Sequence, residues 1–410
     1  MKDLSYLAAA TLLALATVPA AFAQHYTQVN LVANTSGIAP ITDPNLVNPW
    51  GLSRTSSSDW WVSDNGTGLS TLYNGVGTIN SLVVTIPKAA PNSKTFPTGT
   101  PTGTISNAST TDFLLAPGKP ADFLFATIDG TISAWNPTVG IPAGGVAPSK
   151  LATVVFKATD GSSYTGLTSA KIDGKTYLYA ANFTKGRVDV FDNAFAKVPL
   201  SKISGHDNDR NHDRFDENEF ASNSNESLFS DDRLPRDFVP FNVQAIGNNI
   251  VVTFVLHQEG NPFETDGEGL GYVDIFSSTG KLLQRLEHGR WLNAPWGIAL
   301  APLDFGAFSH DLLIGQFAGG NPAEFGGTIA VYNPVTGDFI GDIKDASGKT
   351  LSIPGLWAIS PANSASTSSY DTSAAPASEL YFTAGPDNGT GGLFGYLKPV
   401  AAELTQGNNQ

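Results

Sequence analysis

Residues Tyr177 to Phe191 read YLYAANFTKGRVDVF, and they contain the unit from which most of the chain is built. The run Tyr177–Ala181 is almost entirely apolar, as expected of a strand that is buried on both faces. A turn containing Gly186 follows, and Arg187–Phe191 then alternates polar and apolar side chains before it ends in an aromatic residue. This order predicts two antiparallel strands of one small sheet.

The same strand–turn–strand unit occurs six times, which gives repeats of about 64 residues. The six predicted pairs are Trp60–Asp64 with Ser70–Tyr73, Phe123–Thr127 with Thr131–Trp135, Tyr177–Ala181 with Arg187–Phe191, Ile250–Phe254 with Tyr272–Phe276, Leu312–Gln316 with Thr328–Tyr332, and Leu380–Thr383 with Leu393–Leu397. No amphipathic pattern of helical length with capping residues occurs in the sequence. The chain is therefore expected to be all-β.

A short segment with Pro or Gly and an aromatic residue precedes most of the pairs. Asn48–Leu52 and Asn293–Ile298 are nearly identical, and Tyr164–Leu167, Val239–Val243 and Ile353–Trp357 are looser versions. Proline favours an extended backbone here, and glycine permits close approach of a neighbouring chain. Each segment is expected to begin a further strand that runs inward.

Repeats of this size predict a six-bladed β-propeller, because a β-solenoid needs shorter and more uniform repeats. Closure of the ring requires a strand shared between the two ends of the chain. His25–Asn34 is expected to complete the last blade beside Leu393–Pro399. Seven blades are the alternative, with the additional blade hidden in Ile79–Ile105.

The first 23 residues have the three-part pattern of a secretory signal peptide. Lys2 precedes an apolar run from Leu7 to Val18, and Ala21-Phe22-Ala23 forms a cleavage site before Gln24. The sequence therefore predicts a signal peptide at 1–23, a single propeller domain at 24–400 and a flexible tail at 401–410. The expected location is secreted or periplasmic, with no transmembrane segment.

The composition limits the classes of partner that the chain is expected to bind. The net charge of -14 repels phosphate backbones, so nucleic acid is not an expected partner. The absence of cysteine excludes disulfides, thiolate metal sites and cysteine nucleophiles. The partners expected are a small molecule, a glycan or a protein on one face of a monomeric propeller.

Three stretches interrupt the repeats. Pro87–Thr111 and Ala362–Ser378 are predicted to be irregular loops. Residues Ser204–Asp237 form a polar insertion between blades, in which His206–Asp213 resembles the beginning of an EF-hand loop. That match fails downstream, where His212 replaces the required glycine. A solvated loop, a weak calcium site and a partner-docking loop are the three interpretations.

The Asn-x-Pro-Trp-Gly segments, the stretch Ala181–Phe191 and the closing Leu380–Gly385 resemble an uncharacterised family of exported bacterial and fungal β-propellers. The resemblance covers about Tyr26 to Val400. The chain is also similar to NHL-repeat propellers, whose repeats begin with an Asn-x-Pro-x-Gly phrase. Some six-bladed relatives of the gluconolactonase and regucalcin kind hold a divalent metal in the central channel. The resemblance implies a fold and no established activity.

Polar residues at the inner strand ends are the candidates for ligand binding. They are Asp64, Asn65, Asp129, Asn182, Asn242, His257 and Gln316. Oxygen donors that converge from several blades bind hard cations, so Asp64 and Asn182 are the predicted metal ligands, with Ca²⁺ or another divalent cation as the ion. The alternatives are turn capping for the Asn and Asp side chains and a structural role for His257. The sequence establishes no cofactor.

Trp50, Trp296 and Trp357 occur at one position of the repeat, and Phe241 occupies it in a fourth unit. They are candidates for a ligand-stacking rim, and packing between blades is the alternative. No G-x-S-x-G or H-E-x-x-H motif is present. A binding module is therefore the first functional hypothesis, and a metal-dependent hydrolase or lactonase of the gluconolactonase type is the alternative.

Overall fold

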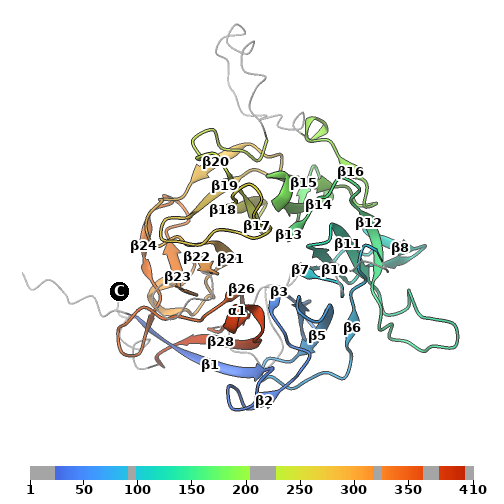
Figure 1. Cartoon of the computed structure of the whole chain (residues 1–410), viewed down its shortest axis with the longest axis horizontal. Helices are drawn as coiled ribbons and strands as arrows, with labels where there is room; N and C mark the ends of the chain where they lie inside the picture. Colours follow the sequence, from blue (N-terminus) through green and yellow to red (C-terminus); the bar gives the residue numbers. More distant parts are fainter. Residues whose placement is uncertain (1–23, 91–97, 204–227, 318–325, 363–377, 402–410) are drawn as a thin grey trace, which may run out of the picture.

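The computed structural model describes residues 24–90, 98–203, 228–317, 326–362 and 378–401. These residues form six sheets of four or more strands, which stand around a central axis (Figure 1). The chain is therefore a six-bladed β-propeller, as the sequence predicts. Among the described residues, no helix has the length and hydrophobicity that crossing a membrane requires.

Each blade begins with its innermost strand and continues outward. Blade 1 contains β3 (Pro49–Ser53), β4 (Trp60–Asp64), β5 (Leu69–Tyr73) and β6 (Val84–Thr85). Blade 2 contains β7 (Pro101–Ser106), β10 (Phe123–Thr127), β11 (Thr131–Trp135) and β12 (Thr153–Lys157). Blade 3 contains β13 (Tyr164–Ile172), β14 (Lys175–Asn182), β15 (Arg187–Phe191) and β16 (Lys197–Val198). Blade 4 contains β17 (Phe238–Ile246), β18 (Asn249–Leu256), β19 (Gly271–Phe276) and β20 (Leu282–Arg285); blade 5 contains β21 (Pro295–Leu300), β22 (Leu312–Gln316), β23 (Ile329–Tyr332) and β24 (Phe339–Asp342).

Blade 6 joins the two ends of the chain. It contains β26 (Leu356–Pro361), β27 (Leu380–Ala384), β28 (Leu393–Pro399), β1 (His25–Ala33) and β2 (Ile41–Thr42), and β25 (Lys344–Asp345) also pairs with β1. Strands β1 and β28 are antiparallel, with pairs that run from Tyr26 opposite Pro399 to Ala33 opposite Leu393. The predicted closure by the N-terminal strand is confirmed.

All six predicted strand pairs are formed, as β4–β5, β10–β11, β14–β15, β18–β19, β22–β23 and β27–β28. The alternative of a seventh blade is wrong. The stretch Ile79–Ile105 contributes β6 to the outside of blade 1 and β7 to the inside of blade 2. The prediction of an irregular loop over Pro87–Thr111 is also wrong in part, because β7 lies within it and is buried throughout.

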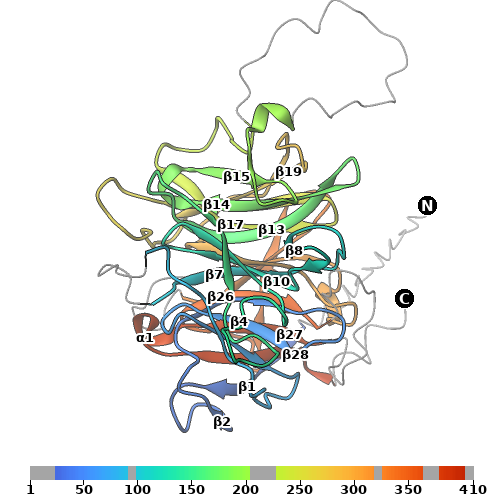
Figure 2. The same ribbon diagram turned by 90° about the vertical axis from the view of Figure 1, so that its right-hand side faces the viewer.

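The remaining described elements are short. They are the hairpin of β8 (Leu114–Ala116) and β9 (Lys119–Pro120), the 3-10 turns η1 (Phe183–Lys185), η2 (Leu200–Lys202) and η4 (Gly306–Phe308), and the single turn α1 (Pro386–Gly389). In the side view the innermost strands β7, β13, β17 and β26 run along the axis, with α1 at one face of the disc and β8 toward the other (Figure 2).

Aromatic contacts join neighbouring blades. The rings of Trp61 and Phe123 stack between blades 1 and 2, with centroids 4.1 Å apart. Those of Tyr73 and Phe394 stack across the closure between blades 1 and 6, at 5.4 Å. Apolar side chains repeated on each blade therefore pack against the next blade, which is how a ring of small sheets builds one continuous core.

The innermost strands lie against one another at their first residues. Each of these strands has a register shift beside its neighbour at this level, for example between Tyr164 and Gly166 in β13. A Cβ on Gly103 would lie 2.4 Å from the backbone nitrogen of Leu167, and one on Gly166 would lie 2.1 Å from Asn242 Oδ1. Glycine is thus required where the ring is narrowest.

Candidate functional site

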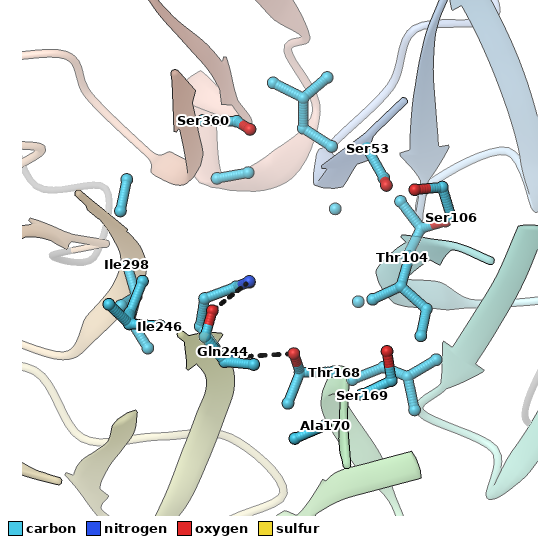
Figure 3. A pocket seen from close by; sticks show the side chains of 18 of the residues that line it. Ser53, Thr104, Ser106, Thr168, Ser169, Ala170, Gln244, Ile246, Ile298 and Ser360 are labelled. Carbon is cyan, nitrogen blue, oxygen red and sulfur yellow. Dashed lines mark hydrogen bonds between the residues drawn. The ribbon is translucent and has the colours of Figure 1, made fainter. Parts of the chain in front are cut away.

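A cavity of about 830 Å³ occupies the axis toward the β8 face (Figure 3). It is lined by the innermost strands of all six blades. The residues of these strands that line it include Leu52 and Ser53 of β3, Thr104–Ser106 of β7, Leu167–Lys171 of β13, Asn242 and Gln244–Ile246 of β17, Trp296 and Ile298–Leu300 of β21, and Ala358–Pro361 of β26. No single blade forms this site, so it depends on the complete ring.

Several polar side chains of the cavity are already held by hydrogen bonds to the backbone of the blades. The hydroxyl oxygen of Thr168 accepts a hydrogen bond from the backbone N–H of Ala245, at 2.9 Å. The amide of Gln244 donates to the carbonyl of Ala245, at 3.4 Å (Figure 3). The hydroxyl of Thr104 donates to the carbonyl of Leu124, at 3.1 Å. These contacts fix the positions of polar groups in advance of any ligand.

The described lining contains one charged residue, Lys171, and no Asp, Glu, His or Cys. Lys171 interacts electrostatically with Asp112. Partial burial alone would raise the pKa of Asp112, but hydrogen bonds from Asn193 and Thr176 and the charge of Lys171 together lower it. Asp112 is therefore ionised at neutral pH, and its charge partly offsets that of Lys171. Lys171 carries the only side chain of the described lining that gains or loses a proton in general acid–base catalysis.

Four aromatic side chains close the axis toward the α1 face. We call Trp50, Phe241, Trp296 and Trp357 the aromatic plug; each side chain is at most 6% exposed. Trp50 stacks on Trp357 with centroids 3.6 Å apart, and it meets the ring of Phe241 from blade 4 at 6.4 Å. Blades 1 and 4 lie on opposite sides of a six-membered ring. Contact between them therefore means that the channel is filled at this level.

Polar contacts fix the plug to the blades around it. Trp296 Nε1 donates to the carbonyl of Thr165, and Trp357 Nε1 donates to Asn48 Oδ1, both at 3.0 Å. Asn242 Nδ2 donates to the carbonyl of Trp296 at 2.7 Å. The surroundings of these aromatic residues are those expected for packing between blades, which is the alternative to a ligand-stacking rim. Of the plug, Trp296 also lines the cavity.

The predicted polar site residues lie mainly away from the cavity. The register of blade 1 places Asp64, the last residue of β4, opposite Pro49, the first residue of β3. The ends of the second strands are therefore at the plug side of the ring. Asp64, Asn65, Asp129, Asn182, His257 and Gln316 do not line the cavity, whereas Asn242 does.

Asp64 is fully buried, and its Oδ2 accepts a hydrogen bond from the backbone N–H of Thr71 at 3.0 Å. Burial raises the pKa of Asp64 well above its ordinary value, and the charge of Asp43 raises it further. Tyr73 donates its phenolic hydrogen to Asp43 at 3.0 Å. Asp64 thus belongs to a buried polar cluster at the closure between blades 6 and 1.

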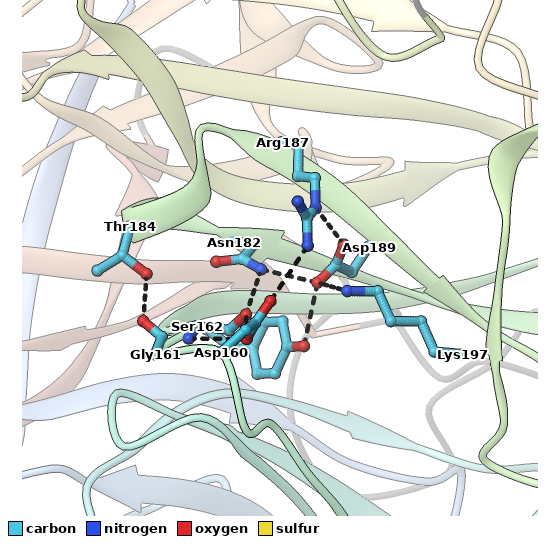
Figure 4. A network of polar contacts seen from close by, with 9 residues as sticks. Asp160, Gly161, Ser162, Asn182, Thr184, Arg187, Asp189 and Lys197 are labelled. Carbon is cyan, nitrogen blue, oxygen red and sulfur yellow. Dashed lines mark hydrogen bonds and ion pairs between the residues drawn. The ribbon is translucent and has the colours of Figure 1, made fainter.

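Asn182 belongs to a different network, in blade 3 (Figure 4). Its Nδ2 donates to Ser162 Oγ at 2.9 Å and to Asp189 Oδ2 at 2.7 Å. Asp189 also accepts from Lys197 Nζ at 2.7 Å and from Arg187 Nε at 2.8 Å. Burial alone would raise the pKa of Asp189, but these partners hold it below its ordinary value.

The two predicted metal ligands are therefore held in separate networks. In the described part of the chain, no three His, Cys, Asp or Glu side chains are grouped as a metal site would require. The EF-hand-like run His206–Asp213 lies outside the described residues. Calcium binding stays a prediction that no geometry in the described residues supports.

The other predicted residues make local contacts that hold turns. Asn65 Nδ2 donates to the carbonyl of Pro101 at 3.1 Å, and Asp129 accepts from the backbone N–H of Ala89 at 2.6 Å. Gln316 Oε1 accepts from the backbone N–H of Asn293 at 2.9 Å. The ring of His257 packs against that of Phe183 at an angle of 40°, with a centroid distance of 4.3 Å. Turn capping and packing describe all of these contacts.

Sequence reasoning missed the hydroxyl groups of the cavity. Ser53, Thr104, Thr168 and Ser169 follow the glycine at the third position of β3, β7 and β13. The signal was present as small polar residues within those segments. It was overlooked because the ends of the second strands, rather than the innermost strands themselves, were expected to line the channel.

Comparison with known proteins gives sequence relatives of unassigned function. The chain is 29% identical over 251 residues to the uncharacterized protein R640 of Acanthamoeba polyphaga mimivirus, which spans 61% of this chain but only 40% of the relative. It is 26% identical over 374 residues to the uncharacterized protein L690 of the same virus, covering 90% of this chain and 84% of L690. No family model matches the chain. The bacterial or fungal exported origin stays a prediction.

Solved structures that resemble the chain have little sequence in common with it. A streptogramin B lyase is 11% identical, with a TM-score of 0.42 over 92% of this chain and 98% of the lyase. The PQQ-bound aldose sugar dehydrogenase of Streptomyces coelicolor is 11% identical, with a TM-score of 0.45 over 92% of this chain and 99% of the dehydrogenase. At these values no activity can be transferred to this chain.

Proposed function

We propose that this protein is a binding module that takes a small molecule into its axial cavity. The observation that carries the proposal is a cavity of about 830 Å³, lined by all six blades, above an aromatic plug that closes the channel beneath it. Cavities of this size are typical of small-molecule sites. A protein partner would need an extended surface, whereas this site is concave and lies on the axis.

Binding without catalysis is favoured by the chemistry of the lining. Apart from the ammonium group of Lys171, the described lining provides hydroxyl, amide and aliphatic groups and no carboxylate or imidazole. Such groups orient a ligand but do not exchange protons with it near neutral pH. Within the described lining only Lys171 could act as an acid or a base, so hydrolysis would require a second such group from the ligand or from outside this lining.

A variant that fills the cavity tests this proposal. Ser53 is partly exposed on the cavity wall, whereas Ser57 is exposed nearby and does not line the cavity. A chemically mixed library of small molecules is screened against the parent protein by the shift in melting temperature. We expect compounds that raise the melting temperature of the parent and of Ser57→Trp, but not of Ser53→Trp. A library in which no compound distinguishes Ser53→Trp from Ser57→Trp would contradict binding in this cavity.

We also propose that the protein is exported, on the basis of the signal-like residues 1–23. The full chain, expressed in a bacterium with a secretory pathway, is expected outside the cytoplasm with Gln24 as its first residue. Mass spectrometry of the intact product measures this directly. A cytoplasmic product that retains Lys2 would overturn the proposal.

A further inference from the structure

The cavity has a polar side formed by the first blades. Ser53, Thr104, Ser106, Thr168 and Ser169 carry hydroxyl groups on β3, β7 and β13 (Figure 3). A hydroxyl group both donates and accepts hydrogen bonds. Because the oxygen of Thr168 accepts from Ala245 while the hydroxyl of Thr104 donates to Leu124, the first retains its hydrogen and the second its lone pairs for a ligand. A ligand that faces this side therefore needs groups that can do both.

The opposite side of the cavity is mainly aliphatic, apart from the amide of Gln244 and the hydroxyl of Ser360 (Figure 3). Ile246 at the end of β17 and Ile298 of β21 lie across the cavity from Thr104 and Ser106 (Figure 3). Leu300 and Ile359 extend the same lining on β21 and β26. Contact with these side chains is favourable only for hydrocarbon, at about 25 cal/mol per Å² of apolar surface removed from water. A fully hydroxylated molecule would lose water against these aliphatic side chains without gaining a partner there.

The charges around the cavity disfavour an ionised ligand. The charge of Lys171 is partly offset by that of Asp112, and no other described lining residue is charged. An anion would also approach a protein of net charge -14 against its field. A cation would find no carboxylate in the described lining, so it would lose hydration without a counter-charge.

We infer that the ligand of this cavity is an uncharged amphipathic molecule, with hydroxyl groups along one edge and an aliphatic face on the other. This inference rests on the proposed function and adds the chemical class of the ligand. The alkyl glycosides and the hydroxylated alicyclic compounds both have this chemistry. The hydroxyls contact the polar side formed by β3, β7 and β13, and the hydrocarbon contacts Ile246, Ile298 and Ile359.

Four small probe molecules test separately the need for hydroxyl groups, for an alkyl chain and for the absence of charge. Hexyl β-D-glucoside combines uncharged hydroxyls with a short alkyl chain, glucose has only the hydroxyls, and hexanoate and hexyltrimethylammonium have the chain with a charge. We expect calorimetry with the full chain to show at least tenfold tighter binding of the glucoside than of the other three. Failure of the glucoside to bind, or binding of a charged probe with equal affinity, would overturn the ligand class.

Two variants assign the two sides of the cavity. Ser169→Ala removes a partly exposed hydroxyl for which no hydrogen bond is formed, and Ile246→Thr removes partly exposed hydrocarbon. We expect each variant to weaken binding of hexyl β-D-glucoside three- to tenfold. The control variants Ser57→Ala and Ile340→Thr, at exposed positions outside the cavity, are expected to leave this binding unchanged. If neither variant weakens binding, the glucoside is not held as inferred. If library compounds nevertheless bind the parent protein and fail to bind Ser53→Trp, the proposed function stands and only the ligand class is wrong. If no library compound behaves in this way, both the ligand class and the proposed function are contradicted.

Discussion

Two aspartates at matching positions of neighbouring blades have opposite surroundings. Asp189 of β15 lies between Lys197 and Arg187, which lower its pKa although its burial alone would raise it. Asp274 of β19 lies beside Arg285, but that guanidinium is bound by Asp231 at 2.5 Å. No hydrogen bond is made to Asp274 Oδ2 within the described residues. Burial, and then the charge of Asp231, raises the pKa of Asp274 to about 8.

The raised pKa of Asp274 predicts a stability that falls as pH rises. A carboxyl with a raised pKa takes up a proton on folding, so its contribution is fully present below about pH 4 and is lost as pH approaches 8. We expect Asp274→Asn to match the parent near pH 4 and to melt at least about 2 °C higher at pH 8.5. Calorimetric scans over this range measure it, with Asp232→Asn, at a fully exposed neighbouring carboxylate, as the control. A lower melting temperature of Asp274→Asn at pH 8.5 would show that the charged form is stabilised instead.

At the scale of the element, the repeated order of strand, turn and strand is sufficient to predict the second and third strands of each blade and insufficient for β7. The first strand of each predicted pair, such as β4 or β18, is rich in buried apolar and aromatic residues. Strand β7 reads PTGTIS and lies at the axis, where Gly103 meets the backbone of β13 and bulky side chains do not fit. A buried strand made of small polar residues has the composition of a loop. The cavity was missed for the same reason, because its hydroxyls belong to strands of this kind.

The close contact between innermost strands predicts a large effect for one methyl group. A Cβ at position 166 would lie 2.1 Å from Asn242 Oδ1 and 2.8 Å from Asn242 Cα, so β13 and β17 would have to separate. We expect Gly166→Ala to lower the free energy of unfolding by about 1–3 kcal/mol. Denaturant titration measures this, with Gly315→Ala as the control, since its nearest contact is a flexible Leu356 methyl at 3.2 Å. If Gly166→Ala lowers the free energy of unfolding by no more than Gly315→Ala does, the ring widens without cost.

At the scale of the whole molecule, the ring is held closed by non-covalent pairing between its two ends. Strand β1 pairs with β28 along Tyr26 to Ala33, and Tyr26 donates its phenolic hydrogen to the carbonyl of Phe305 at 2.8 Å. The cavity and the plug both take residues from the first and last blades, so opening of blade 6 would disrupt the site together with the fold. The stability of the closure therefore limits the stability of the binding site.

A disulfide across this closure is expected to stabilise the protein. Thr27 and Lys398 are exposed partners on β1 and β28, and paired residues of antiparallel strands have Cα separations that a disulfide can span. The chain contains no cysteine, so Thr27→Cys with Lys398→Cys can form only this intramolecular bridge. Because the bridge would restrict nearly the whole unfolded chain, we expect a gain of about 2–4 kcal/mol that a reductant abolishes. Thermal melts with and without reductant measure the gain, and Thr27→Cys alone is the control. If the oxidised double variant melts at the same temperature as its reduced form, unfolding begins within a blade and not at the closure.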